Sequence, residues 1–341
     1  MTAPPLAPTR TQRSDEMEIP MSANHKLISI EGIAKRYPSK GDAPLTIFED
    51  IWLSIDRGEF VCIIGHSGCG KTTVLNILAG LDQPSSGVVI VDGKEISGPS
   101  LDRAVIFQGH ALLPWMTVLG NVAYAVGARH PKWPRERVRE HAMRFIELVG
   151  LTNSALRRPA ELSGGMKQRV GIARALALEP KTLLMDEPFS ALDALTRGTL
   201  QDEVRRICLD SGQTAMMITH DVDEAIYLAD RIVLMTNGPQ ARFAEIVENT
   251  LPRERIRHDL HRLPGYYDIR NHLMDFLVTR SASFDDELSK GREWNARSVP
   301  RVRPTSGAAI PGNPGSPDCT ASQFAASSHS ASTHPTKDES P

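Results

Sequence analysis

The sequence of 341 residues has few cysteines, and they stand far apart. Cys62, Cys69, Cys208 and Cys319 form no Cys-x-x-Cys pair and show no metal-ligand spacing, which argues against a disulfide framework and a zinc-finger type of site. Two of them stand in apolar or glycine-rich segments, as is typical of proteins in a reducing compartment. We therefore expect no disulfide bonds.

The sequence also lacks an excess of either charge and an export signal. The formal net charge is −2 at pH 7, so no large basic field is expected, and a dedicated nucleic-acid binder is disfavoured, although a local basic patch stays open. Residues 1–25 contain no apolar core of a secretory signal. We expect them to form a disordered N-terminal tail.

Long hydrophobic runs are missing as well. The most apolar long window, residues 104–128, is interrupted by Gln108, His110, Pro114 and Asn121, which argues against a membrane-spanning helix. Any role at a membrane must therefore come through a partner.

What is present is a pattern of alternating strands and helices. Short β-rich runs in residues 27–60 predict a strand-rich edge, and "GVVIVDGKEI" predicts a hairpin with Asp92 and Gly93 at its turn. Apolar positions at helical spacing predict a helical lobe at about residues 109–178. Strands then alternate with helices again. The predicted fold class is α/β, with a strand-rich edge, a mostly parallel core sheet and a helical lobe.

The composition also divides the chain into regions. Residues 26–240 carry the strand and helix patterns and are expected to form the main domain. Residues 241–280 form a C-terminal extension. From residue 281 to 341, Ser, Ala, Pro, Gly and Thr dominate, and such a segment cannot offset its ordering entropy. We expect it to be a disordered tail; a functional tail is the alternative.

A phosphate-binding loop is predicted between a strand and a helix. Residues Gly65 to Thr72 fit the pattern G-x-x-x-x-G-K-T, in which glycines let backbone N–H groups point at phosphate oxygens. Lys71 would meet the β- and γ-phosphates of ATP, and the Thr72 hydroxyl would ligate Mg²⁺. The alternative is a glycine-rich turn before an ordinary helix. The predicted phosphate-binding residues are Gly65, His66, Ser67, Gly68, Cys69, Gly70, Lys71, Thr72 and Thr73.

A pair of carboxylates follows another predicted strand. Asp186 and Glu187 come at the end of "TLLMDEP", which places them at the carboxyl edge of the sheet beside the phosphate loop. Asp186 would hold Mg²⁺, and Glu187 would polarise an attacking water as general base. Most Asp-Glu pairs are solvated surface charges, and that is the alternative here.

A second anion site is predicted in "ELSGGMKQRVGIARAL". Ser163, Gly164 and Gly165 begin a helix, so a hydroxyl and bare backbone N–H groups stand at its positive end. A glycine-rich helix start without a ligand is the alternative reading of these residues.

With these segments in order, residues 27–240 resemble the ABC-transporter ATPase family, so residues 26–240 are expected to be its ATPase cassette. The resemblance implies that Leu162–Met166 faces the γ-phosphate held by a second subunit, although Met166 replaces the commonest family residue, Gln. It also assigns four single residues. Tyr37 would stack on adenine, Gln108 would lie near Mg²⁺ and the attacking water, Asp193 would belong to the loop at the dimer interface, and His220 would touch the γ-phosphate.

Taken alone, Tyr37 is an amphipathic packing residue and His220 a satisfied surface group; only the ordered set of motifs assigns them to ATP. The catalytic set implied is Glu187, His220, Gln108 and Lys71, and the metal-binding set is Thr72, Gln108 and Asp186. The predicted cofactors are ATP and Mg²⁺.

The resemblance also implies partners. The apolar run after Gln108 predicts a docking site for a separate transmembrane permease at Leu112, Leu113, Pro114 and Trp115, with a piece of local core as the alternative. A second ATPase subunit, the same or a related chain, would complete the nucleotide sites. An extracytoplasmic solute-binding protein would take part indirectly. The chain would then lie peripherally on the cytoplasmic face of the inner membrane.

The segments "ALLPWMTVLGNV" and "THDVDEAIYLADRIVLMTNGP" resemble those of the importer subgroup for nitrate, sulfonate and taurine. The "YYDIRNHLMDFL" extension is most similar to the nitrate and cyanate members of that subgroup. The implied cargo is nitrate, or nitrite or cyanate; sulfonate, taurine and bicarbonate are alternatives. A cassette ATPase of repair, translation or regulation is the alternative of another class.

One residue in the loop predicts a chemical reactivity. Cys69 lies near a helix N-terminus, which can favour the thiolate, so a maleimide would inactivate the ATPase and MgATP would protect it. An inert small residue is the alternative.

Overall fold

A computed structural model describes residues 26–38, 44–281, 283–284 and 294–305 of the chain. These residues belong to one compact unit, Met1–Ser306, and the second unit, Gly307–Pro341, lies outside the described residues. The predicted N-terminal tail, residues 1–25, lies outside them too.

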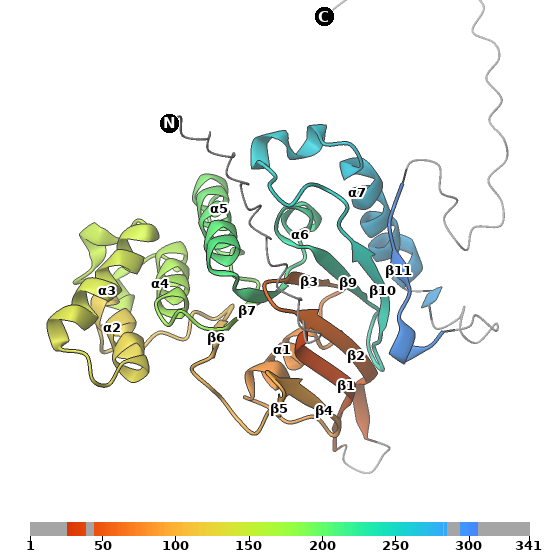
Figure 1. The fold of residues 1–341 in the computed structure, drawn as a ribbon, viewed down its shortest axis with the longest axis horizontal. Helices are drawn as coiled ribbons and strands as arrows, with labels where there is room; N and C mark the ends of the chain where they lie inside the picture. Colours follow the sequence, from red (N-terminus) through yellow and green to blue (C-terminus); the bar gives the residue numbers. More distant parts are fainter. Residues whose placement is uncertain (1–25, 39–43, 282, 285–293, 306–341) are drawn as a thin grey trace, which may run out of the picture. The chain divides into compact units, whose positions relative to one another are not determined.

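A seven-stranded sheet forms the centre of this unit, with the order β11-β10-β9-β3-β8-β7-β6 (Figure 1). Strands β6, β7, β8, β3 and β9 run parallel, β10 is antiparallel to β9, and β11 is parallel to β10. Their bounds are β3 Phe60–Ile64, β6 Arg103–Ile106, β7 Thr182–Asp186, β8 Thr214–Ile218, β9 Arg231–Met235, β10 Phe243–Glu248 and β11 Arg301–Val302. The prediction of a mostly parallel core sheet is confirmed.

The strand-rich edge is a separate antiparallel sheet with the order β2-β1-β4-β5. Asp92 and Gly93 have φ of +52° and +73°, which is the left-handed backbone that a two-residue hairpin turn requires. The predicted hairpin is therefore confirmed. The strands are β1 Lys26–Tyr37, β2 Leu45–Asp56, β4 Ser86–Val91 and β5 Lys94–Glu95.

Helices cover both faces of the central sheet. Along β7, Leu183 and Met185 pack into one apolar core, together with α4 (Gly164–Leu176), α5 (Ala194–Ser211) and α6 (Val222–Leu228). Leu184, between them, packs into a second core with α1 (Lys71–Ala79) and the smaller sheet. Because alternate side chains of a strand point to opposite faces, α1 and α4 lie on opposite sides of the sheet.

Helix α1 ends at Ala79, and Gly80 forms its C-cap. The φ of Gly80 is +76°, and a Cβ there would lie 2.3 Å from the carbonyl oxygen of Gly98. Only glycine allows this turn, because any side chain would add both backbone strain and a clash.

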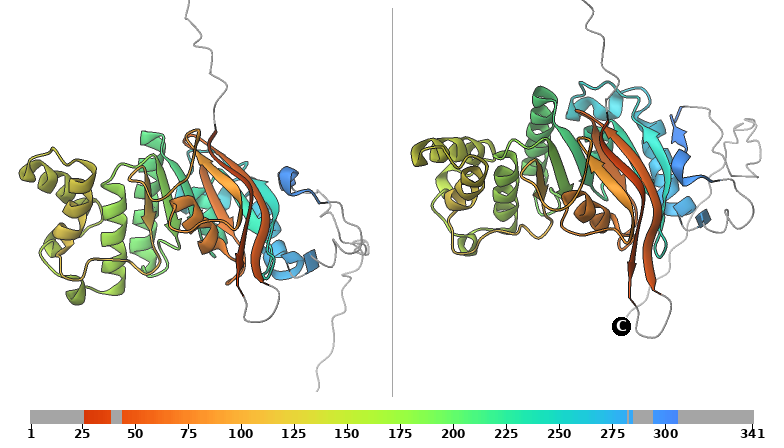
Figure 2. Two further views of the ribbon diagram at one scale, coloured as in Figure 1. Left: turned by 90° about the horizontal axis from the view of Figure 1, so that it is seen from below. Right: turned by 60° about the horizontal axis from the view of Figure 1, so that its bottom comes forward.

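The helices α2, α3 and α4 gather at one end of the unit, as both views of Figure 2 show. Helix α2 spans Val118–Arg129 and α3 spans Arg135–Leu148, and the 3₁₀ turns η1 Thr152–Ser154 and η2 Pro159–Glu161 lead into α4. On α3, Ala142, Phe145 and Ile146 face the core, at the helical spacing that the sequence shows.

The C-terminal extension, residues 241–280, contains β10, η3 Arg257–Arg262, α7 Tyr266–Asp275 and a π-helical turn η4 Phe276–Arg280, and η5 Ala296–Ser298 follows it in the chain. Ile269, Leu273 and Phe276 pack in the same core as Ala244 and Val247 of β10. Residues 294–305, which lie in the region expected to be disordered, pair with β10: Ile246 N donates to Pro300 O, and β11 pairs with β10.

None of the helices in the described part of the chain has the length and apolar character needed to cross a membrane.

Candidate nucleotide site

The phosphate loop lies between β3 and α1, where the sequence places it. A Cβ at Gly65 would lie 2.8 Å from Met235 O, and one at Gly70 would lie 2.7 Å from Ile47 Cγ2, so both positions require glycine. At Gly68, whose φ is +82°, an added Cβ would meet nothing within 4 Å. The loop is thus packed tightly from behind and open at its centre, as a cradle for phosphate must be.

Lys71 is buried at the start of α1 and curls back over the loop. Its Nζ donates to the carbonyl oxygens of Gly65 and His66, each at 2.7 Å. These two carbonyl oxygens hold the ammonium against the loop. Phosphate oxygens would replace them as acceptors at small cost.

Thr72 and Asp186 meet across the groove between α1 and β7. The Thr72 hydroxyl lies 3.3 Å from Asp186 Oδ1. Burial raises the pKa of Asp186, the neighbouring carboxylate of Glu187 adds to the rise, and the Thr72 hydrogen bond opposes it. A hydroxyl and a buried carboxylate at one point are the hard oxygen ligands that Mg²⁺ prefers, so these residues fit the predicted cation.

Gln108 and His220, which come from two separate motifs, both approach one carboxylate oxygen of Glu187. Glu187 Oε2 accepts a hydrogen bond from Gln108 Nε2 at 3.1 Å and lies 3.4 Å from His220 Nδ1. The Glu187 backbone is in the left-handed region, with φ of +46°, and its N–H donates to Ile218 O at 3.0 Å. Such strain in a non-glycine residue gathers at functional sites.

His220 itself stays open to solvent, with 68% of its side chain exposed. It lies two residues after the end of β8, and the next residue, Asp221, caps the start of α6 by accepting from two backbone N–H groups. The backbone beside His220 is therefore held in place, whereas its imidazole ring stays open to solvent.

Tyr37 lies at the end of β1 and is 42% exposed, which leaves a ring face free for stacking. It pairs with Leu45 on β2, two residues before Ile47, which contacts the phosphate loop at Gly70. Lys35 Nζ lies 5.1 Å from the centre of the Tyr37 ring. The strand pairing thus carries Tyr37 to the side of the loop.

The signature residues lie elsewhere. Ser163 is exposed, and its hydroxyl accepts from Met166 N at 3.3 Å, which caps α4. Gly165 fits against Ala191, since a Cβ there would lie 3.1 Å from Ala191 O. Because α4 and α1 cover opposite faces of the sheet, a single chain does not bring this helix start to its own phosphate loop.

Gly165 also links the signature residues to the segment before Asp193. Asp193 caps α5 by accepting from Thr196 N at 3.0 Å. Gly165 thus lies against Ala191, two residues before Asp193, the residue that caps α5.

The predicted docking residues differ in exposure. Leu112 packs against the core, Leu113 is half-buried, and Pro114 and Trp115 are exposed, Trp115 to 66%. The exposed indole is the strongest candidate for a partner contact among these four.

Sequence reasoning missed the residue that organises this loop. Asn121 is fully buried, accepts from Leu113 N at 2.8 Å, and donates through Nδ2 to the carbonyl oxygens of Leu113, Met116 and Thr117. In the sequence it stood only as a polar interruption of an apolar window. A polar residue in such a window, just after the first turn of a helix, was the available signal.

The thiolate predicted for Cys69 is not supported. Cys69 is fully buried in the second apolar core, and burial raises the pKa of its thiol, although Lys71 beside it acts in the opposite direction. The prediction of a reactive thiolate is wrong, because the side chain points into the core while only the backbone lines the phosphate cradle. Cys62 and Cys208 are free and buried as well, and Cys319 lies outside the described residues.

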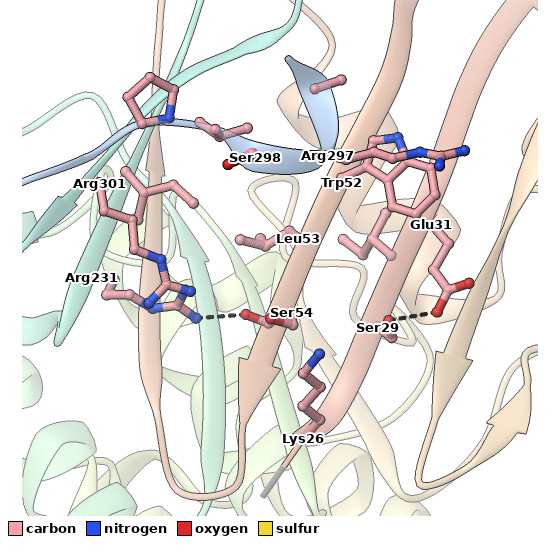
Figure 3. Close-up of a pocket in the computed structure, with 15 residues that line it drawn as sticks. Lys26, Ser29, Glu31, Trp52, Leu53, Ser54, Arg231, Arg297, Ser298 and Arg301 are labelled. Atoms are coloured by element: carbon pink, nitrogen blue, oxygen red, sulfur yellow. Dashed lines mark hydrogen bonds between the residues drawn. The ribbon is translucent and has the colours of Figure 1, made fainter. Parts of the chain in front are cut away.

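A cleft of about 600 Å³ lies apart from this site, between β1, β2 and residues 296–301 (Figure 3). Charged groups in it are held by other protein groups. Arg231 binds Glu59 and donates to Ser54 O at 2.6 Å, and Arg297 stacks over Trp52. None of the predicted nucleotide residues lines this cleft.

Comparisons with known proteins agree with this geometry. The sequence profile of the family described as "ABC transporter" matches residues 48–190. The bicarbonate transport ATP-binding protein CmpD of Synechococcus elongatus is 47% identical over 280 residues, which is 82% of this chain and all of that protein. The nitrate import ATP-binding protein NrtD of the same organism is 46% identical over 265 residues, covering 78% of this chain and 96% of NrtD.

Among solved structures, the dimeric ATP-binding cassette MJ0796, in a post-hydrolysis state with ADP and Pi, is similar with a TM-score of 0.57 and 32% identity. The match covers 61% of this chain and 93% of that one. The fold described above is thus that of an ATP-binding cassette.

Proposed function

Because the chain belongs to the ABC transporter family, we propose that it is the ATP-hydrolysing subunit that powers import of a small anion, most directly nitrate. One observation carries the proposal: the convergence of Gln108 and His220 on Glu187, beside Lys71 and the Thr72–Asp186 pair. Hydrolysis of a nucleoside triphosphate needs a phosphate cradle, a hard-cation site and a carboxylate base close together.

Each residue has a distinct task in hydrolysis. Lys71, which donates to the loop carbonyls, would donate to the β- and γ-phosphates. Thr72 and Asp186 would hold Mg²⁺, which would neutralise phosphate charge. Glu187 takes the proton of the attacking water. Gln108 and His220 contact the same carboxylate oxygen, so they hold it in place as the water is deprotonated.

The pocket is completed by a second copy of the chain in this proposal. The exposed Ser163 and Gly164 at the start of α4 would meet the γ-phosphate bound to the partner's loop. The similar cassette MJ0796 was solved as a dimer with ADP and Pi, which supports such pairing. Two ATP molecules then favour the closed pair, and their hydrolysis lets the pair open.

Separate transmembrane permease subunits would turn this motion into transport. We place their contact at Pro114 and Trp115, with Leu112 and Leu113 behind them. The chain would sit on the cytoplasmic face of the inner membrane, and an extracytoplasmic solute-binding protein would deliver the anion without touching it.

The cargo assignment is supported by relatives rather than by the site, since no residue of the site contacts the anion. Relatives named for nitrate import and for bicarbonate transport are equally similar, at 46–49% identity, so bicarbonate is the second candidate.

Uptake of isotope-labelled nitrate and bicarbonate by cells lacking the gene tests this proposal. We expect wild-type protein to restore nitrate uptake, and Lys71→Ala, which cannot hold the phosphates, to leave it at the level of the deletion. Restoration of bicarbonate uptake alone would replace the cargo. Restoration of neither, with the permease genes present, would contradict the importer.

A further inference from the structure

One side chain of the phosphate loop points away from the phosphate cradle. His66 Nε2 lies 2.7 Å from the carbonyl oxygen of Leu277, which is 211 residues further along the chain. A carbonyl oxygen only accepts, so Nε2 carries the proton and donates. Leu277 lies in the π-helical turn Phe276–Arg280, and such turns within helices recur at functional sites.

The main chain of the same histidine is engaged with the phosphate-binding lysine. The carbonyl oxygen of His66 accepts from Lys71 Nζ at 2.7 Å. A single residue therefore connects the ammonium that meets the phosphates to the C-terminal extension. A movement of Leu277 would change the position of the peptide group that holds Lys71.

The extension is anchored firmly enough to transmit such a movement. Glu245 on β10 is buried and binds both His272, at 2.9 Å, and Arg280. Burial raises the pKa of Glu245, but the hydrogen bonds from these two side chains outweigh it and leave the pKa below its ordinary value. Ile269, Leu273 and Phe276 are fully buried in the first core.

The extension also contacts helix α6, the element that follows His220. Tyr266 Oη and Arg270 Nε donate to Asp223 Oδ1 on α6, at 2.6 and 2.9 Å. Helix α6 begins two residues after His220. The extension thus contacts both the phosphate loop and helix α6, which follows His220.

We propose that His66 is a positioning residue through which the C-terminal extension, residues 265–281, holds the phosphate loop, so that nucleotide binding and packing of the extension are coupled. By linkage, any partner that binds the extension then changes the affinity for ATP, and ATP changes the packing of the extension. This inference rests on the proposed function, because it takes the loop to be an ATP site.

The test compares side chains that differ in where they carry an N–H group. Gln places its Nε2 where His66 has Nε2, whereas Asn is one bond shorter and Ala has no donor. We expect His66→Ala and His66→Asn to raise the KM for MgATP about 3- to 10-fold with kcat changed less than about twofold, and His66→Gln to restore the wild-type KM. Ser281→Ala is the matched control, because Ser281 Oγ donates to the same carbonyl at 3.1 Å from outside the loop.

Amide hydrogen exchange in residues 266–281 gives the second readout. In the wild type and in His66→Gln, a non-hydrolysable ATP analogue should slow exchange in this segment, and in His66→Ala it should not. Equal KM values for all four variants, or analogue-induced protection that persists in His66→Ala, would overturn the inference while leaving the ATPase intact. Failure of the wild type to bind the analogue would instead overturn the proposed function.

Discussion

The chain has two glycine-rich helix starts, at α1 and at α4, and they differ in what surrounds them. At α1 the loop is backed by Met235 and Ile47, and Lys71 is held by carbonyls of the loop itself. At α4 the start is exposed, and Ser163 Oγ caps the helix by accepting from Met166 N. In the proposed dimer, the first start would hold the phosphates, whereas the second would present its donors to the ligand bound by the other chain.

The largest expected effect comes from freezing the paired state. Glu187→Gln removes the proton acceptor and keeps the bond from Gln108, so we expect turnover to fall about 100-fold or more and ATP to stay bound. Dimers should then persist in MgATP, as measured by analytical ultracentrifugation. Glu203→Gln, which changes a surface carboxylate paired with Arg206, serves as the control and should behave as wild type. A monomeric, ATP-loaded Glu187→Gln protein would break the comparison between the two helix starts.

A smaller effect is expected on the thermal stability of the protein when Asp186, beside α1, is changed. A carboxyl whose pKa rises on folding stabilises the fold only while protonated, and that contribution is lost as the pH rises from the unfolded-chain pKa through the folded-state pKa. At neutral pH the buried Asp186 carboxylate therefore destabilises the nucleotide-free protein. We expect Asp186→Asn to raise Tm by about 2–4 °C, or about 1 kcal/mol, and to abolish the further rise caused by MgATP.

The matched variant changes Asp193, a carboxylate near the signature residues. Asp193 caps α5 near the signature residues, and this hydrogen bond lowers its pKa, so the carboxylate stabilises the fold at neutral pH. Asp193→Ala should lower Tm in differential scanning calorimetry, in the direction opposite to Asp186→Asn. A lower Tm for Asp186→Asn would show that its carboxylate is a structural residue rather than a strained cation ligand.

The contrast between the two helix starts also shows what sequence can predict. The phosphate loop, the carboxylates of β7 and the parallel sheet could be predicted because they depend on local sequence patterns. Glycine spacing and apolar runs indicate the backbone conformation of these segments directly. The burial of Cys69, the bonds of Asn121 and the reach of His66 to Leu277 depend on which distant segments pack together. The pairing of residues 294–305 with β10 belongs to the same class, because it depends on a neighbouring strand that offers unpaired backbone groups.

The most direct test mixes two chains that are inactive for different reasons. Lys71→Ala disables the phosphate loop and keeps a sound signature segment. Gly164→Asp does the reverse, and it leaves the fold intact, because a Cβ at Gly164 meets nothing within 4 Å and an acidic residue suits a helix start. The mixed dimer can be isolated through two different affinity tags.

In that dimer, the intact loop of one chain faces the intact signature segment of the other. The account predicts that the mixed dimer regains ATPase activity to at least about a tenth of the wild-type rate, while each parent stays below about one hundredth. A mixed dimer that is as inactive as its parents would contradict the claim that two copies share each pocket.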